Sequence, residues 1–289
     1  MTFWNHVSGE IPYPLTNDYL FRVVVQRHDR VLRDILCSML SLKEEDIQSI
    51  RITNQIVPGE RIDEKEYILD INLLMNGSIS VNIELQVINY NDWPERSLQY
   101  LCRSFDLLNK GQLYSDSKTT IHIGILCFAL FPDFDEYFSS FRRMSEGSYR
   151  IFTDKFQLYT LCLPNLEHAT EEDASFRRNM WGRYFKVKTW EELKAMADVY
   201  PVIEETAEEV YKCITDEAIR RRIEAREDYE RRQRTLLWQL AEKDRQMAEK
   251  LAEKDEQLAE KLAEKDEQLA EKDSEIADLK RRMAEAGLL

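Results

Sequence analysis

The stretch ILDINLLMNGSISVNIELQV, residues 68–87, decides the fold of this chain. On both sides of its Asn-Gly-Ser centre polar and apolar residues alternate, which is typical of two β-strands joined by a tight turn. Alternation places every second side chain on the same face of a strand. The polar positions are Asp70 and Asn72 in the first strand and Asn82, Glu84 and Gln86 in the second. An ordinary solvated sheet explains the alternation, but it does not explain why only carboxylates and amides occupy these positions.

The length of the turn decides whether the two polar faces coincide. A two-residue loop would pair Asp70 with an isoleucine and set polar side chains against apolar ones. A three-residue Asn-Gly-Ser loop, with Gly77 or its neighbour in the left-handed region, pairs Asp70 with Glu84 and Asn72 with Asn82. Because a slip of one residue inverts a whole strand, only the three-residue loop keeps the faces matched. It predicts Asp70 and Glu84 side by side, with their Cβ atoms about 5 Å apart.

Two adjacent carboxylates repel each other unless a positive charge lies between them. A hard divalent cation such as Mg²⁺ takes one or two carboxylates in proteins and keeps several waters. Such an ion polarises a phosphodiester and lowers the pKa of bound water. The pair therefore predicts a metal site, and the alternative is a polar sheet face hydrogen-bonded to the first helix.

Around this stretch the chain alternates between helical and strand-like patterns. The first helix is expected to begin after Leu15, with Thr16 as N-cap and Asp18 in the first turn, and its apolar face continues to Leu42. A second helix is expected from Pro94 to about Leu113, with Leu98 on its buried face. The predicted strands are Ile50–Val57, Tyr67–Leu74, Ile79–Val87, Thr120–Leu130, Tyr149–Thr153 and Phe156–Leu163. The order α-β-β-β-α-β predicts an α/β fold, a mixed sheet flanked by helices.

Composition limits the classes of function. The 289 residues carry a formal net charge of −14, so the chain lacks the overall basic character of a protein that coats nucleic acid. The longest apolar run, Ile123–Phe131, is far shorter than the roughly 20 residues that span a bilayer. The start, MTFWNHVSGEIP, has no signal-peptide pattern. Five scattered cysteines without ligand-like spacing favour a reduced, cytoplasmic compartment and argue against a zinc site.

Three regions follow from these patterns: a domain over residues 1–165, a helical extension over 166–238 and a repeat region over 239–289. The repeat AEKDEQLAEKL, residues 252–262, has close copies on both sides. Its apolar residues recur every seven or four positions, which favours a coiled coil that assembles a homo-oligomer. A solvated single helix that serves as a spacer is the alternative. The basic segment IRRRIEAREDYERRQR, residues 219–234, is either a phosphate-tracking helix or a solvated helix whose charges balance.

The chain resembles a known family at several places in order. Asp70 followed by Glu84-x-Gln86 on two strands after an N-terminal helix resembles the PD-(D/E)xK nuclease signature. The longer matching stretches are LTNDYLFR (15–22), YILDINLLMNGSISVNIELQV (67–87), ERSLQYLCRSF (95–105), IHIGILCFALF (121–131) and FQLYTLCLPNL (156–166). Together they resemble the recombination-promoting nuclease and transposase family over roughly residues 14–235.

The resemblance implies a restriction-endonuclease-like fold and Mg²⁺-dependent cleavage of DNA, with Mn²⁺ as an alternative ion. It implies that Asp70 and Glu84 ligate the metal and that Asp18 helps to complete the site. Gln86 stands at the position of the family's catalytic lysine and cannot supply its charge, so Arg22 or Arg96 is the expected electrostatic substitute. The family's activity is associated with recombination and with defence against invading DNA. The alternative is a catalytically silent module that binds DNA or protein and oligomerises through its repeat.

Overall fold

A computed structural model describes residues 3–54, 70–106, 108 and 110–285 of the chain. In this part of the chain the strands form one mixed sheet in the order β1-β2-β3-β4-β6-β5. The strands are β1 Ile50–Ile52, β2 Ile71–Met75, β3 Ile79–Gln86, β4 Thr119–Leu126, β5 Phe138–Arg142 and β6 Phe156–Cys162. β3, β4 and β6 run parallel, whereas β1, β2 and β5 pair antiparallel with their neighbours.

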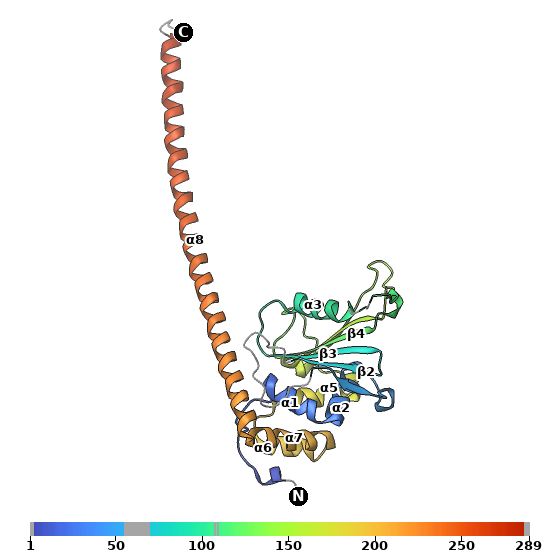
Figure 1. The fold of residues 1–289 in the computed structure, drawn as a ribbon. Helices are drawn as coiled ribbons and strands as arrows, with labels where there is room; N and C mark the ends of the chain where they lie inside the picture. The colour runs from blue at the N-terminus through green and yellow to red at the C-terminus, as the bar shows by residue number, and fades with distance from the viewer. Residues whose placement is uncertain (1–2, 55–69, 107, 109, 286–289) are drawn as a thin grey trace. The chain divides into compact units, whose positions relative to one another are not determined.

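Helices cover both faces of the sheet. They are α1 Asp18–Arg27, α2 Asp29–Leu40, α3 Trp93–Phe105, α4 Glu171–Ser175, α5 Arg178–Lys186, α6 Trp190–Ala197, α7 Pro201–Thr215 and α8 Glu217–Glu285. Short 3-10 turns lie at Phe3–His6, Glu44–Asp46, Tyr114–Asp116 and Leu163–His168. α3 packs alone on one face, while α1, α2 and α5 lie on the other with α7 beyond them (Figure 1). The mixed α/β architecture predicted from the sequence is confirmed.

The two faces of the sheet differ in chemistry. The odd-numbered residues of β3, and those of β4 from Ile121 on, are aliphatic and join the main hydrophobic core with α1, α2 and α7. The even-numbered residues, which face α3, include the buried polar side chains Asn82, Glu84 and His122. Because these polar groups lie under a helix rather than in water, this sheet face is not a solvated surface.

The first predicted helix is wrong in two details. Asn17 rather than Thr16 caps it, since the Asn17 side chain accepts a hydrogen bond from the Leu20 N–H at 3.0 Å. The continuous pattern to Leu42 is divided at His28, whose extended backbone (φ −126°, ψ 101°) ends α1 and starts α2. His28 Nε2 lies 3.1 Å from Glu209 Oε2 on α7, so a contact remote in the sequence accompanies the break.

Other elements also differ from the prediction, and the strand predicted to reach Leu130 ends at Leu126. α3 ends at Phe105, and its Leu98 is exposed although the pattern placed it on the buried face. Tyr149–Thr153 is not a strand, because only an isolated bridge between Met144 and Ile151 forms there. The strand at this edge of the sheet, beside β6, is instead β5, which the sequence pattern missed because its two consecutive serines obscure the alternation. Residues 55–57 and 67–69 of two predicted strands lie outside the described residues.

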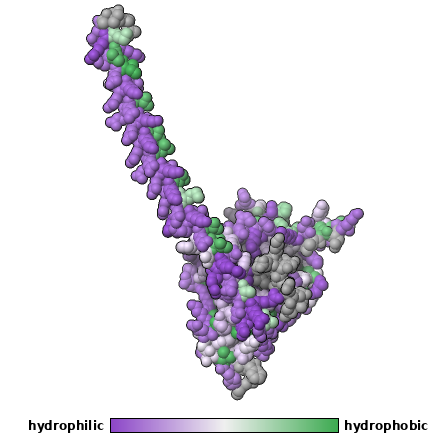
Figure 2. Space-filling view, turned by 60° about the vertical axis from the view of Figure 1, so that its left-hand side comes forward, coloured by the Kyte–Doolittle hydropathy of each residue, from purple (hydrophilic) through white to green (hydrophobic). Residues whose placement is uncertain are grey.

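The chain divides into two compact units, residues 1–230 and 231–289. In the first, α5, α6 and α7 share the hydrophobic core of the sheet domain. In the second, α8 continues as a single helix whose apolar side chains form an exposed stripe along one side (Figure 2). The stripe comprises Leu240, Met247, Leu251, Leu258, Leu262, Leu269, Ile276, Leu279 and Met283. A boundary at residue 165 stays a prediction, and no described helix is long and apolar enough to cross a membrane.

Candidate metal centre

The β2–β3 turn has the predicted three-residue loop. Met75 pairs with Ile79, and Asn76 and Gly77 between them both adopt left-handed backbone angles (φ 51° and 69°). Asparagine and glycine tolerate these angles best, so the local sequence specifies this turn. The Asn76 side chain also accepts hydrogen bonds from the backbone of residues 48 and 49, which ties the turn to β1.

The turn sets the register of the polar face. Asn72 pairs with Asn82, as predicted, and the Asn82 side-chain amide donates to the Asn72 side-chain oxygen at 2.7 Å. The same register carried two residues further sets Asp70 opposite Glu84, each only 3% exposed. At such a cross-strand position two Cβ atoms lie about 5 Å apart. Two carboxyl groups are therefore buried next to each other.

Burial shapes the acidity of this pair. Burial raises the pKa of Asp70 and of Glu84, because a low-dielectric surrounding disfavours the charged form. The nearby Asp70 carboxylate raises the pKa of Glu84 further, and the Arg96 guanidinium opposes both shifts. The pair therefore favours either a proton or a cation in place of two bare charges.

Arginine side chains approach the pair from two helices. Nε and Nη2 of Arg96, on α3, both lie 2.9 Å from Oε1 of Glu84. Arg22, on α1, is buried near Asp70 and donates a hydrogen bond to the Asn54 carbonyl oxygen. The structure thus brings both arginines that the sequence offered as electrostatic substitutes close to the carboxylates.

His122 and Tyr100 belong to the same cluster, although the sequence pattern did not select them. His122, on β4, is fully buried with Nε2 3.7 Å from Oε2 of Glu84, and its ring stacks on Tyr100. Burial lowers the pKa of His122 to about 3, so the imidazole is neutral. The Tyr100 side chain hydrogen-bonds the Asp70 carboxyl. Two features of the sequence could have identified these residues: a histidine inside an otherwise apolar strand, and a tyrosine one helical turn after Arg96.

Several buried oxygen atoms of the cluster lack a hydrogen-bond partner. They are Oδ2 of Asp70, Oε2 of Glu84 and Oδ1 of Asn82, and both ring nitrogens of His122 share this property. Buried polar atoms without partners are uncommon in folded proteins, and carboxylate and amide oxygens are the ligands that hard divalent cations prefer. Among the described residues there is no group of three or more histidine, cysteine, aspartate or glutamate side chains that could hold a metal ion. The cluster fits a cation held by two carboxylates, with water as the remaining ligands.

Asp18 and Gln86 have other partners. Asp18 is buried at the start of α1, where Nε of Arg226 on α8 lies 2.8 Å from both of its carboxylate oxygens. That Asp18 is a third metal ligand stays a prediction. To bind the ion, the Asp18 carboxylate would have to break its contact with Arg226. Gln86 is buried beyond Glu84, and its side-chain amide donates to the Ile88 carbonyl oxygen at 2.9 Å.

A cavity opens beside the carboxylates along α3. Its volume is about 260 Å³, and it is lined by Asp92, Glu95, Arg96, Gln99, Tyr100 and Arg103. Arg96 and Tyr100 contact the carboxyl cluster from the same helix. A ligand in this cavity would therefore lie next to the candidate centre.

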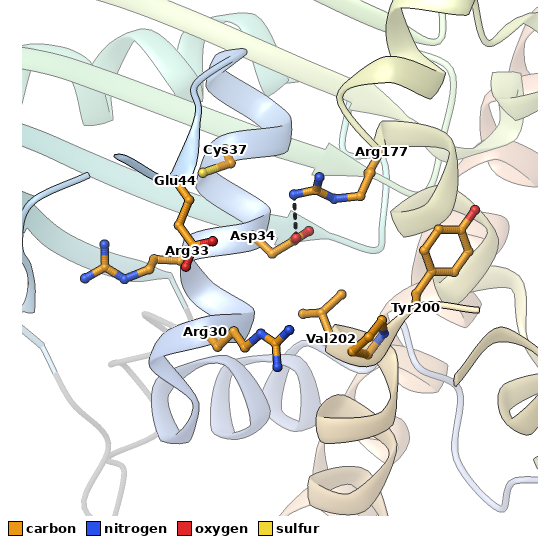
Figure 3. A pocket seen from close by; sticks show the side chains of 9 residues that line it. Arg30, Arg33, Asp34, Cys37, Glu44, Arg177, Tyr200 and Val202 are labelled. Carbon is orange, nitrogen blue, oxygen red and sulfur yellow. Dashed lines mark hydrogen bonds and ion pairs between the residues drawn. The ribbon is translucent and has the colours of Figure 1, made fainter. Parts of the chain in front are cut away.

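A second cavity of about 260 Å³ lies among α2, α5 and α7 (Figure 3). Its arginines are balanced by acids, since Arg177 lies 2.6 Å from Asp34 and Arg33 lies 3.0 Å from Asp29. No buried polar atom without a partner lines it in the described part of the chain. This cavity therefore lacks the unsatisfied oxygens that distinguish the carboxylate cluster.

Comparisons with known proteins bear on the whole of this arrangement. A family model described as PD-(D/E)XK nuclease family transposase matches residues 15–239, a range that includes the sheet, α3 and the start of α8. Searches of curated proteins and of solved structures found no match.

Proposed function

This chain belongs to the PD-(D/E)XK nuclease transposase family, and on that premise we propose that it is a divalent-metal-dependent DNA endonuclease. One observation carries the proposal. Two buried carboxylates, Asp70 directly before β2 and Glu84 on β3, each keep an oxygen without a partner beside a cavity lined by Arg96. This is the arrangement that a hydrolytic metal centre for a phosphodiester needs.

Each residue of the cluster has a role in this proposal. Asp70 and Glu84 would hold the ion, Mg²⁺ or Mn²⁺, and Asp18 would join them once released from Arg226. When bound, a divalent ion polarises a phosphodiester and acidifies water. Arg96, 32% exposed at the cavity, can bind a phosphate oxygen and stabilise the extra charge of the transition state. Neutral His122 lies against Glu84 and limits how that carboxylate can turn.

The assembly and location of the protein form a further part of the proposal. Residues 239–289 are proposed to join copies of the chain into a homo-oligomer, which the exposed apolar stripe of α8 supports. The five cysteines are free thiols in the structure, and a reduced, cytoplasmic setting suits them.

Cleavage of supercoiled plasmid in Mg²⁺ or Mn²⁺, with EDTA as the blank, tests the function. Asp70→Ala and Glu84→Ala are each expected to abolish cleavage, because each removes a direct ligand of the ion. Asp70→Ala is also expected to leave the metal-free melting temperature unchanged or higher, since it relieves repulsion between buried carboxylates. Asp133→Ala, an exposed acid away from the cluster, is the matched control and should cleave like the wild type.

Cleavage that survives in Asp70→Ala would contradict the site. A silent binding module is the second candidate, favoured by Gln86 at the lysine position and by the ion pair that Arg96 makes with Glu84. It predicts that the wild type does not cleave plasmid in the presence of any divalent ion, and that none of these ions raises its melting temperature.

A further inference from the structure

A short hairpin between β5 and β6 extends beyond the sheet. Residues 142–152, RRMSEGSYRIF, form this basic-aromatic hairpin, which Figure 1 shows as a yellow-green loop. The Phe152 N–H donates to the Arg143 carbonyl oxygen at 2.9 Å, and Met144 forms a bridge with Ile151. The hairpin is thus an ordered arm, although it is too short to count as a pair of strands.

The tip of the arm is a defined turn. The Ser145 N–H donates to the Arg150 carbonyl oxygen at 3.0 Å, and the Tyr149 N–H donates to the Ser145 carbonyl oxygen at 2.9 Å. Tyr149 adopts a left-handed backbone angle (φ 53°), which is uncommon for an aromatic residue. The turn holds the backbone of Tyr149 in this conformation although the angle is unfavourable for it.

The arm exposes aromatic rings to solvent. Phe152 is 79% exposed and Tyr149 is 76% exposed, and Met144 and Ile151 beside them are also exposed. Clustered apolar side chains at a protein surface mark a place where another molecule binds. Tyr149 near the tip and Phe152 at the base of the arm are thus exposed rings on which a planar partner can stack.

Basic side chains lie among these rings. Arg143 and Arg150 are exposed, and within the described residues neither makes an ion pair, whereas Arg142 lies 3.2 Å from Asp154. Over residues 141–155 basic side chains outnumber acidic ones by four to two, in a chain whose net charge is −14. Guanidinium groups beside open aromatic rings are the combination that binds the phosphates and stacks on the bases of single-stranded nucleic acid.

α3 links this arm to the candidate metal centre. Arg96 near its start binds Glu84, and Phe105 at its end contacts Phe156, the first residue of β6 after the arm, at a ring distance of 6.0 Å. Nine residues of helix span about 14 Å, which corresponds to about four base steps of B-DNA. A DNA strand several nucleotides longer than this span is therefore long enough to run from the cavity beside Arg96 past Phe156 to the base of the arm.

We propose that the basic-aromatic hairpin binds single-stranded DNA, with Tyr149 and Phe152 stacking on unpaired bases and Arg143 and Arg150 contacting phosphates. This inference rests on the proposed function for the identity of the nucleic acid. It assigns to the protein a preference for DNA with unpaired bases, because the bases of an intact duplex do not offer their faces to a side chain.

Fluorescence anisotropy of the full-length protein in EDTA tests the inference without cleavage. The probes are a fluorescein-labelled 20-nucleotide single strand and a blunt duplex of the same sequence. Tyr149→Ala with Phe152→Ala is expected to weaken binding of the single strand at least about tenfold and that of the duplex less. Arg143→Gln with Arg150→Gln should lower the salt dependence of single-strand binding by about 1.4 in log-log slope.

Matched variants separate stacking from general effects. Phe152→Leu keeps an apolar side chain without a ring and should weaken single-strand binding as much as the single substitution Phe152→Ala, measured beside it. Arg183→Gln, an exposed arginine on α5, should bind like the wild type. Melting curves should coincide for all variants because the side chains are exposed.

Unchanged single-strand binding in the Tyr149→Ala, Phe152→Ala variant would overturn the inference, and so would duplex binding that exceeds single-strand binding. A lower oligomeric state of the hairpin variants in light scattering would also overturn it, since the arm would then contact protein. If the hairpin substitutions weaken single-strand binding but the wild type does not cleave plasmid, the role of the arm is supported and the nuclease function is contradicted. Plasmid cleavage by the wild type, together with single-strand binding that the hairpin substitutions do not change, would support the nuclease and contradict the role of the arm.

Discussion

The two carboxylate oxygens of Glu84 have different surroundings. One of its oxygens binds Arg96, and the other faces His122 without a hydrogen bond. A guanidinium and a metal ion are both cations, so they compete for the same carboxylate. In the structure Arg96 neutralises Glu84, and in the proposed nuclease it would exchange this carboxylate for a substrate phosphate.

Arg96→Ala is expected to separate these two roles. Removing the competing cation should tighten Mn²⁺ binding, whereas loss of the charge near the scissile phosphate should lower kcat by about 10² to 10³. Calorimetry gives the ion affinity and plasmid cleavage gives the rate. Arg183→Ala, at an exposed arginine on α5 that does not line this cavity, is the control and should match the wild type in both measurements. Weaker ion binding in Arg96→Ala would show that Arg96 holds Glu84 in place for the metal.

The pH dependence of stability follows from the buried acids. Burial raises the pKa of Asp70 and Glu84 above their usual 3.8 and 4.5, so the folded protein keeps these protons at pH values where the unfolded chain has lost them. Their contribution to the free energy of unfolding is full below the unfolded-state values and is lost as pH rises through the folded-state values.

As pH rises from about 4 to about 8, the melting temperature of the metal-free wild type should therefore fall more than that of an Asp70→Asn, Glu84→Gln variant. Added Mn²⁺ should recover stability at the upper end, with release of protons that calorimetry in two buffers detects. Parallel melting profiles for the two proteins would contradict the buried acids as the cause.

At the scale of elements, α3 and β4 approach each other unusually closely over the candidate centre. A Cβ atom built on Gly124 would lie 2.1 Å from Cζ2 of Trp93. The absence of a side chain at Gly124 therefore allows α3 to pack closely against β4. Gly124 pairs with Glu84 in the sheet, and Trp93 opens the helix that carries Arg96. The position of the arginine therefore depends on this contact.

Gly124→Ala is expected to displace α3 and to cost about 1–3 kcal/mol of unfolding free energy, the usual penalty for overpacking. Cleavage should fall as well, because Arg96 and Tyr100 move with the helix. Gly147→Ala, where nothing lies within 4 Å of an added Cβ, should leave the melting temperature unchanged. Equal melting and equal cleavage in both variants would contradict the role of this contact.

At the scale of the whole molecule, burial ends where the first compact unit ends. Ile219 and Ile223 at the start of α8 join the hydrophobic core, and Glu230 is the last buried residue of the helix. From residue 231 the helix has no hydrophobic core of its own, and its apolar stripe is exposed. A helix of this kind gains stability when a second helix covers the stripe.

Deleting residues 239–289 should lower the oligomeric order and leave the melting temperature of the sheet domain unchanged. Light scattering at micromolar concentration measures the first and circular dichroism the second. Leu258→Gln with Leu262→Gln, in the full chain, should weaken assembly without shortening the helix. Monomers for both the full-length and the truncated protein would favour the spacer alternative.

The sequence by itself determined the β2–β3 hairpin, its three-residue turn and the pairing of Asn72 with Asn82. These features are local, because turn geometry and the two-residue period of a strand act on neighbouring residues. The α/β class and the long C-terminal helix were likewise readable, since periodicity reports which face of one element is buried.

Only the tertiary structure decided what surrounds the carboxylates. His122 and Tyr100 come to Glu84 and Asp70 through packing of β4 and α3, and Arg226 meets Asp18 across 208 positions of the chain. The break at His28 and the edge strand β5 likewise depend on neighbours that no local pattern contains. Periodicity describes one element at a time, whereas the partner of a buried charge is set by how distant elements pack together.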